Sequence, residues 1–405
     1  MDRKDVIIIG GGAAGYFAAI NIAESNPELN VLILEKSSKV LQKVKVSGGG
    51  RCNVTHACFD PKELVSYYPR GQKELLGPFH SFMTGDTMDW FEKKGIELKI
   101  EEDMRMFPVS NSSQTIIDCF VTSAKNAGVT VALNQNVIEI KTSDNGFLIT
   151  TKTKQYRADK LLITTGGNSK TWEIIKGLGH TIIDPVPSLF TFNIKDSLLE
   201  NIPGISVPDA LVSIKGLKHM AQGPVLITHW GLSGPAVLKL SSLAARDLSD
   251  SNYDFEIELN WINSTKEETE EKLRRYKTEN PKKKIGIRSP VPEISRRLWE
   301  NILARAVADP QMNWSDLPKK KLESLSEVLT CSSFKVKGKT TFKEEFVTAG
   351  GVDLKEINFK RFESKLHPNL YFAGEVLNID GLTGGFNFQN AWTGGFIAAR
   401  AISKF

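Results

Sequence analysis

The sequence predicts an α/β protein in which segments from both ends of the chain build one parallel sheet and a β-rich domain is inserted between them. An apolar strand over residues 6–9, a helix over 13–24 and a second apolar strand over 31–34 follow one another. This is the order of a βαβ unit, and strands without polar alternation are typical of a parallel sheet covered on both faces. A further apolar strand over 370–373 and a helix over 388–403 end the chain.

The middle of the chain changes character twice. Helical spacing covers residues 80–100 and 112–127, and strands are predicted over 129–140, 147–153 and 160–164. Pro185 and Pro187 then interrupt the pattern, because proline cannot donate to a strand ladder. We therefore predict a discontinuous α/β domain over residues 1–188 and 343–405. The inserted domain covers 189–342 and is barrel-like and β-rich over 189–262 and about 330–342, with a helical part over 263–329.

The charge balance does not indicate a highly charged partner. The 405 residues carry 52 basic and 47 acidic side chains, a net charge of +5. This excess is too small to predict nucleic-acid or membrane binding, although it mildly favours anionic ligands. The basic runs at 282–284 and 319–321 are accordingly interpreted as solvated surface. No apolar stretch reaches the length of a membrane span. We therefore expect a small-molecule substrate, no nucleic acid and no membrane.

The four cysteines indicate neither a metal site nor a redox pair. Cys52, Cys58, Cys119 and Cys331 form no C-x-x-C motif and no spacing typical of zinc ligands. Buried or free thiols are the simpler interpretation. So sparse a use of cysteine is typical of a protein of the reducing cytoplasm.

A glycine-rich turn joins the first strand to the first helix. Residues 10–15 fit G-x-G-x-x-G: Gly10 permits the tight turn, Gly12 lets the backbone approach a pyrophosphate, and Gly15 lets helix and strand pack closely. Glu35 ends the second strand 20 residues later, where a carboxylate accepts hydrogen bonds from ribose hydroxyls and repels a 2′-phosphate. The pattern predicts a Rossmann-type dinucleotide site that disfavours NADP.

Three later segments favour FAD over NAD as the dinucleotide. Residues 47–53 (SGGGRCN) form a second glycine-rich loop. FAD extends through this region and needs backbone close to it, whereas NAD does not. Residues 162–167 (LITTGG) and 370–375 (LYFAGE) resemble the A-T-G and G-D segments of two-dinucleotide-fold flavoproteins. The Gly- and Asn-rich stretch 381–395 precedes the last helix, whose N-terminal dipole would stabilise negative charge on a reduced flavin.

Taken together, the motifs resemble one bacterial family. The segments that carry the resemblance are Lys43 with 47–53, then 105–108 (RMFP), 228–235 (THWGLSGP), 347–352 (VTAGGV), 363–365 (ESK), 373–375 (AGE) and 384–389 (GGFNFQ). The family comprises NAD(P)/FAD-dependent oxidoreductases, some of them aminoacetone-oxidase-like, and includes a bile-acid-type reductase. The resemblance implies a split FAD domain with a β-rich insert and a helical piece. This chain departs from the family at Asn378, where an aspartate is usual, and at 361–362 (RF), where Thr-Met is usual.

These considerations predict one cofactor site and leave the catalytic residues open. The predicted FAD contacts are Gly10, Gly12, Ala13, Ala14, Gly15, Glu35, Lys36, Lys43, Ser47, Gly48, Gly49, Gly50, Arg51, Asn53, Val137, Thr165, Gly166, Gly167, Gly374, Glu375, Gly385, Asn387, Phe388 and Gln389. Candidates for catalysis or substrate binding are His229, Arg51 and Lys43, with His56 a weaker one. No second G-x-G-x-x-G motif is present, so NAD(P)H is expected only as a transient reductant at the flavin.

Three functions are compatible with these motifs. The preferred one is an FAD-dependent oxidoreductase that transfers hydride between flavin N5 and a small organic substrate or NAD(P)H. The second is a flavoprotein that modifies RNA, which would require a strongly basic face and a reactive cysteine near the flavin; the net charge of +5 argues against the basic face. The third is a flavin-binding sensor or scaffold without catalysis.

Overall fold

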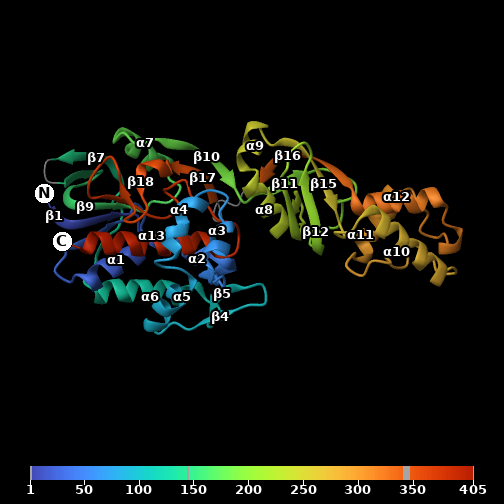
Figure 1. Cartoon of the computed structure of the whole chain (residues 1–405), viewed down its shortest axis with the longest axis horizontal. Coiled ribbons are helices and arrows are strands. Elements are labelled where there is room, and N and C mark those ends of the chain that lie inside the picture. The colour runs from blue at the N-terminus through green and yellow to red at the C-terminus, as the bar shows by residue number, and fades with distance from the viewer. Residues whose placement is uncertain (1, 144–145, 341–346, 405) are drawn as a thin grey trace. The chain divides into compact units, whose positions relative to one another are not determined.

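The computed structural model describes residues 2–143, 146–340 and 347–404 (Figure 1). The chain folds into two compact units, residues 1–186 together with 343–405, and residues 187–342. The second unit begins two residues before the insert expected from the prolines. The first unit is thus built from both ends of the chain.

The first unit is built on a sheet whose central strands are parallel. β6 (Thr130–Ala132), β2 (Val31–Leu34), β1 (Asp2–Ile9), β9 (Gln155–Ile163) and β20 (Leu370–Phe372) are neighbours in this order. The register places Ile9 beside both Leu34 and Ile163, so these strands end at one edge. The strands predicted at 6–9, 31–34 and 370–373 are confirmed, and their apolar side chains are buried. The Rossmann-type α/β fold is therefore correct.

Further elements of this unit extend the sheet or cover its edge. β7 (Val137–Ser143) and β8 (Gly146–Thr151) continue the sheet in antiparallel fashion from β9, and β18 (Ile357–Asn358) and β19 (Glu363–Ser364) continue it from β20. A small antiparallel sheet consists of β3 (Thr55–His56), β5 (Arg105–Pro108) and β4 (Leu98–Ile100). The other elements are α2 (Gln42–Gly50), α3 (Pro61–Ser66), α4 (Gln72–Phe79), α7 (Ser169–Gly177), β10 (Ile182–Ser188), β17 (Val347–Val352) and η2 (Leu354–Glu356).

Two of the predicted elements are wrong in extent. The helix expected over 80–100 is α5 (Thr84–Lys93), followed by β4. Gly95 separates the two with a φ of +77°, which ends a helix at little cost because glycine lacks Cβ. The strand expected over 129–140 is two strands, β6 and β7, and Asn134 between them has a φ of +55°. The helix expected over 112–127 is confirmed as α6 (Ser113–Asn126).

Helix α1 (Ala13–Ser25) and helix α13 (Phe386–Ser403) lie side by side, although they come from opposite ends of the chain (Figure 1). A Cβ on Gly395 would lie 3.1 Å from the carbonyl oxygen of Ala14, so this close approach favours glycine. Between the helices and α6, the rings of Phe17, Phe120 and Trp392 form a buried aromatic cluster. Packing of this density fixes the position of the first turn of α13 relative to α1.

The second unit contains a closed antiparallel barrel. Its strands in order are β11 (Thr191–Ile194), β14 (Gly231–Ser233), β13 (Met220–Ile227), β12 (Ser206–Ile214), β15 (Asp254–Asn260) and β16 (Ser332–Thr340). The predicted barrel-like insert is correct, but the helices α8 (Pro235–Leu243) and α9 (Ala245–Asp250) were not expected within its β-rich part. The helical part is confirmed as α10 (Lys266–Glu279), α11 (Arg296–Arg305), η1 (Trp314–Asp316) and α12 (Lys319–Thr330).

A buried histidine couples the stability of the first unit to pH. The His180 ring is buried, with Nδ1 2.7 Å from a Glu356 oxygen and Nε2 2.9 Å from Ser364 Oγ. Burial lowers the pKa of His180 below its ordinary value of 6.5, against the opposing effect of Glu356. The unfolded chain then binds a proton more readily than the folded chain, so the free energy of unfolding falls as the pH drops through 6.5.

We expect a His180→Gln variant to show a smaller loss of unfolding free energy between pH 7.5 and pH 5.5 than the parent protein. Urea unfolding at each pH measures this difference. The matched control is His219→Gln on the second unit, where the imidazole is partly exposed beside Asp247. Equal pH dependence in the parent and in His180→Gln would contradict the assignment.

Candidate flavin-binding site

The first turn of α1 meets the carboxyl edge of the sheet at a glycine turn. Gly10 has a φ of +112°, and a Cβ on Gly15 would lie 2.0 Å from the carbonyl oxygen of Gly10. Both positions therefore require glycine for backbone conformation or for packing. Gly12 differs, because a Cβ there would meet nothing within 4 Å. No side chain caps the helix at Gly12, so its first-turn N–H groups, including those of Ala13 and Ala14, are available to an anion.

The Glu35 carboxylate is held at this turn by backbone N–H groups. One carboxylate oxygen accepts a hydrogen bond from the Gly11 N–H at 2.7 Å, and the other accepts from the Ser37 N–H at 2.9 Å. A carboxylate has about four lone-pair sites, so these bonds position Glu35 and leave acceptor capacity for ribose hydroxyls. Lys36 beside it is exposed, and Val137 lies at the first position of β7.

The second glycine-rich loop combines forced turns with open space. Gly48, Gly49 and Gly50 have φ values of +57°, +66° and +82°. A Cβ on Gly48 would lie 2.9 Å from the Asn53 N, whereas one on Gly49 or Gly50 would meet nothing within 4 Å. Ser47 closes the loop by accepting the Cys52 N–H at 3.0 Å through its carbonyl oxygen. The backbone of this loop is thus shaped by glycine and open on one side.

The two glycine-rich ends of the chain meet. A Cβ on Gly385 would lie 2.6 Å from the carbonyl carbon of Thr55, and the His56 Nδ1 is 3.2 Å from the Gly384 oxygen. The Trp392 indole N–H donates to the Val54 oxygen at 2.9 Å. Residues 54–56 directly follow the loop at 47–53, so the loop and the turn before α13 belong to one site. A single long cofactor that contacts both segments requires this juxtaposition.

Asn387 and Gln389 hold this junction together. Asn387 bonds the backbone of Gly381 in both directions, at 2.8 and 2.9 Å. The buried Gln389 amide accepts from Thr55 and Thr87 and donates to Thr393. Their side chains have partners within the protein and position the turn, and their contact with a cofactor stays a prediction. Phe388 is stacked on Trp392 with an interplanar angle of 9°.

The carboxyl ends of β9 and β20 complete the edge. Gly374 lies between α1 and α13, with a Cβ position 3.4 Å from the Ala14 Cβ and 3.9 Å from the Ala391 Cβ. A Cβ on Gly166 would lie 3.5 Å from the Glu375 Oε2, and one on Gly167 would lie 2.8 Å from the Thr348 Oγ1. Ligands of open α/β sheets bind in the crevice outside this edge of the strands.

Lys43 and Arg51, predicted as FAD contacts and as candidates for catalysis or substrate binding, are both paired with carboxylates. Lys43 Nζ lies 2.6 Å from the Glu375 Oε2. Arg51 lies 2.6 Å from a Glu101 oxygen, and its guanidinium carbon is 3.9 Å from the centre of the Phe107 ring. Lys43 and Glu375 were predicted as separate FAD contacts, but they form an ion pair with each other. Arg51 shapes the glycine-rich loop and has a carboxylate partner already.

These residues fit a long polar cofactor. Gly12, Gly49 and Gly50 leave open space beside their Cα atoms. Three buried oxygens of the same region have no hydrogen-bond partner in the described chain: the side-chain oxygens of Asn53, Thr165 and Asn378. A buried polar atom without a partner costs about 1–3 kcal/mol. A ligand that supplies donors along this edge would remove the cost.

The titratable groups near the glycine-rich loop differ in burial and in pKa. Burial raises the pKa of the Cys52 thiol to about 12, so Cys52 is a neutral thiol and not a reactive one. Burial lowers the pKa of His56 below its ordinary value. Because a carbonyl only accepts, His56 Nδ1 carries the proton shared with Gly384, and Nε2 is left to bind or release another. His229 is an exposed residue of the second unit, at the turn before β14.

Sequence reasoning ranked His229 above His56 because it did not anticipate the contact of His56 with Gly384. The available signal was the position of His56, three residues after the glycine-rich loop. Its contact with Gly384 depends on α13 folding back over β3, which no local pattern predicts.

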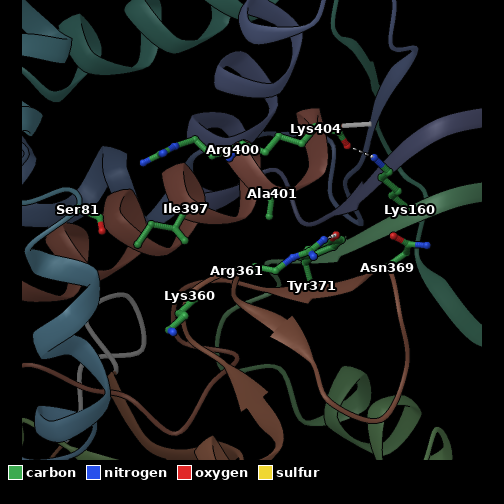
Figure 2. Close-up of a pocket in the computed structure, with 10 residues that line it drawn as sticks. All are labelled: Ser81, Lys160, Lys360, Arg361, Asn369, Tyr371, Ile397, Arg400, Ala401 and Lys404. Atoms are coloured by element: carbon green, nitrogen blue, oxygen red, sulfur yellow. Dashed lines mark hydrogen bonds between the residues drawn. The ribbon is translucent and has the colours of Figure 1, made fainter.

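Figure 2 shows a separate cationic pocket of the first unit, with a volume of about 590 Å³. It lies at the C-terminal end of α13, which spans about 27 Å from the turn at its N-terminus. Lys160 donates to the backbone oxygen of Ile402 at 2.6 Å, and Arg361 is paired with Glu363 at 3.0 Å. Because the pocket is remote and these cations are engaged, we do not assign it to the flavin site.

A match to a protein-family model shows the family of the chain. The HI0933-like protein Rossmann domain matches residues 4–401. The chain belongs to this HI0933-like family. The FAD-binding Rossmann domain and the flavoprotein resemblance predicted from the motifs are thereby confirmed.

Relatives of this HI0933-like protein include proteins with named reactions. It is 29% identical to the ribosomal RNA dihydrouridine synthase of Escherichia coli (strain K12), over 99% of this chain and 98% of that protein. It is 24% identical to the 3-dehydro-bile acid delta(4,6)-reductase of Clostridium scindens, over 98% of each chain. The solved 3-ketosteroid-delta4-(5alpha)-dehydrogenase of Rhodococcus jostii RHA1 has the same fold, with a TM-score of 0.54 at 14% identity, over 100% of this chain and 97% of that one. Among the described residues, no helix is long and apolar enough to cross a membrane.

Two alanine substitutions should separate folding from cofactor binding. We expect Gly15→Ala to lower the free energy of unfolding by about 1–3 kcal/mol, because its methyl group would collide with the Gly10 oxygen. Gly12→Ala should cost less than about 1 kcal/mol, the difference between glycine and alanine at a helix N-cap. Because its methyl group would enter the open space, it should weaken FAD binding at least about tenfold.

Urea unfolding of the apoprotein and titration with FAD measure these two effects. Gly77→Ala, inside α4 and also in open space, is the control that adds a methyl group elsewhere in the unit. Undiminished FAD affinity of Gly12→Ala would contradict the placement of the cofactor.

Proposed function

We propose that this protein is an FAD-dependent reductase of carbon–carbon double bonds conjugated to a carbonyl, and that its substrate is a uracil base of ribosomal RNA. Reduction of uridine to dihydrouridine saturates the C5=C6 bond, which is conjugated to the C4 carbonyl. The bond named for the bile-acid relative is of the same kind, because a 3-oxo group activates the Δ4 and Δ6 double bonds. The common chemistry is addition of hydride at the carbon remote from the carbonyl and of a proton at the other.

The choice of RNA depends on one observation, the full-length similarity to the ribosomal RNA dihydrouridine synthase of Escherichia coli. It covers 99% of this chain, and therefore both the FAD-binding unit and the insert. The identity to the bile-acid reductase is lower, at 24% over a similar length. This proposal reverses our expectation of a small-molecule substrate and adopts the second of the three functions compatible with the motifs. It does so without the reactive cysteine expected of that function, because burial raises the pKa of the Cys52 thiol to about 12.

Each part of the site has a distinct role in this proposal. The first turn of α1 and Gly12 would hold the pyrophosphate, Glu35 would hold the adenosine ribose, and Glu375 with Lys43 would contact the ribityl chain. The bound flavin supplies the hydride chemistry. The turn at 384–386 and the loop at 47–53 would border the reacting end of the bound cofactor.

The reduction also consumes a proton, and His56 is the residue we assign to it. Its Nδ1 is fixed by the Gly384 oxygen at 3.2 Å, and its ring lies 4.6 Å from that of Phe386 and 5.6 Å from that of Tyr67. These contacts orient Nε2 as the atom that releases the proton. Because burial lowers the pKa of His56, its protonated form is a stronger acid than a free imidazolium.

The first test is to supply the holoenzyme with candidate substrates. We expect a yellow protein that releases FAD, is reduced anaerobically by NADH or NADPH, and forms dihydrouridine in an unmodified ribosomal RNA transcript, detected by mass spectrometry of the digested nucleosides. A 3-oxo-Δ4,6 bile acid is the competing substrate. Rapid oxidation of the reduced flavin by the bile acid, with no dihydrouridine in the RNA, would favour the small-molecule alternative.

The second test addresses His56. We expect His56→Gln to lower the rate of dihydrouridine formation by about 10²–10⁴, while reduction of the flavin by NAD(P)H is unchanged. In the parent, the rate should fall as pH rises through the lowered pKa of His56, because the protonated form is consumed. His367→Gln, whose imidazole bonds the Leu178 oxygen, is the control. An unaltered pH profile in His56→Gln would rule out this role.

A further inference from the structure

We propose that the distal tip of the helical part of the insert is the surface that docks the RNA phosphate backbone. We define the distal tip as residues 277–288 and 310–321. The inference depends on the proposed function, because it names the element that binds the RNA substrate.

The topology of the second unit brings the two basic runs together. Helix α10 leaves the barrel after β15, and α12 returns to it before β16, so the end of α10 and the start of α12 lie away from the barrel (Figure 1). Lys284 forms a β-bridge with Asn313, and Lys277 Nζ donates to the Leu317 oxygen at 2.6 Å. The runs at 282–284 and 319–321 therefore belong to one surface.

Positive charge is concentrated in the tip and in the longer segment 272–321 that contains it. The tip carries eight Lys or Arg side chains and two carboxylates, those of Glu279 and Asp316. Over 272–321 there are 14 Lys or Arg against five Asp or Glu, an excess of nine, whereas the whole chain has an excess of five. The rest of the protein is thus net acidic. Such a patch is the electrostatic footprint typical of nucleic-acid binding.

The basic loop at the tip is rigid. The Ile285 N–H donates to the Met312 oxygen at 2.9 Å, and the Gly286 N–H donates to the Pro310 oxygen at 3.0 Å. The Trp314 N–H donates to the Lys283 oxygen at 2.9 Å. Binding therefore costs little backbone entropy, and only the lysine side chains have to be ordered.

Four of the eight cations of the tip contribute little to folding. Lys282, Lys283, Lys284 and Arg288 are exposed, and within the described part of the chain none of these four has a carboxylate in ion-pair distance. Three consecutive lysines occupy the first turn of α12, which no side chain caps. Cations at a helix N-terminus are disfavoured by the helix dipole. This arrangement stabilises a bound polyanion and not the free protein.

RNA fits this surface better than an anionic membrane does. Ile287, 62% exposed, is the one large exposed apolar side chain in the described residues of the tip. Membrane-surface docking requires several apolar anchors beside the basic residues. A single apolar side chain between Lys284 and Arg288 is enough to pack on a ribose or base and too little for a lipid bilayer.

The test compares two variants that remove the same charge from the same unit. Lys282→Gln/Lys283→Gln/Lys284→Gln alters the tip, and Lys218→Gln/Lys335→Gln/Lys337→Gln alters exposed positions of the barrel. Binding of the full holoprotein to an unmodified ribosomal RNA transcript is measured between 50 and 300 mM salt, together with flavin content and dihydrouridine formation. Lys319→Gln/Lys320→Gln provides a second tip variant should the first fold poorly.

We expect the tip variants alone to weaken RNA binding, by about 10- to 100-fold for the triple variant, and to reduce the slope of log affinity against log salt by about two to three. Flavin content and reduction by NAD(P)H should not change. Equal effects of the tip and barrel variants, or none, would overturn the inference. Tip-dependent retention on phosphatidylglycerol vesicles without tip-dependent RNA binding would also overturn it.

The same experiment separates this inference from the proposed function. If the parent protein binds RNA through the tip but forms no dihydrouridine, the docking surface stands and the proposed function fails. If dihydrouridine forms and the triple tip variant has an unchanged KM for RNA, the function stands and the docking surface falls.

Discussion

The close packing of α13 on α1 is the constraint on which the flavin site depends. Helix α1 carries the glycine turn at the edge of the sheet, and α13 brings the last glycine-rich turn to the same edge from the other end of the chain. Small residues permit the approach: Gly395 faces the Ala14 oxygen, and Gly374 lies between Ala14 and Ala391. A larger side chain at any of these positions would separate the two helices. The loop at 47–53 would then lose the surface against which β3 is held.

The N-terminal half of the site could be predicted from sequence because its causes are local. Gly10 and Gly15 serve a turn and a helix–strand contact within six residues, and Glu35 follows at a fixed distance in a βαβ unit. The roles of Asn387 and Gln389 could not be predicted in this way. A polar residue beside a glycine turn has the same appearance whether it faces a ligand or the protein. Only the fold brings Thr55 and Thr87 to Gln389 and gives its side chain partners within the protein.

The elements with wrong bounds have a similar physical explanation. Periodic spacing over 80–100 continues through Gly95, but a single residue at positive φ ends the helix and lets the chain turn into β4. Likewise, the apolar pattern over 129–140 does not reveal that Asn134 turns the chain between two strands. One residue at positive φ is enough to reverse the backbone. A periodic pattern is an average over many residues and does not reveal such a single position.

Net charge is a poor guide to polyanion binding when the charge is unevenly distributed. An electrostatic field decays over roughly 8 Å at physiological salt, so an approaching phosphate backbone responds to the local surface and not to the sum over the chain. The net charge of +5 argued against RNA as a partner, yet the 50 residues from 272 to 321 hold an excess of nine positive charges. The remaining chain carries a net excess of acidic residues, which hides this local excess in the total. The appropriate quantity is therefore the charge of each folded element, which requires knowing that α10 and α12 place two separate lysine runs at one end.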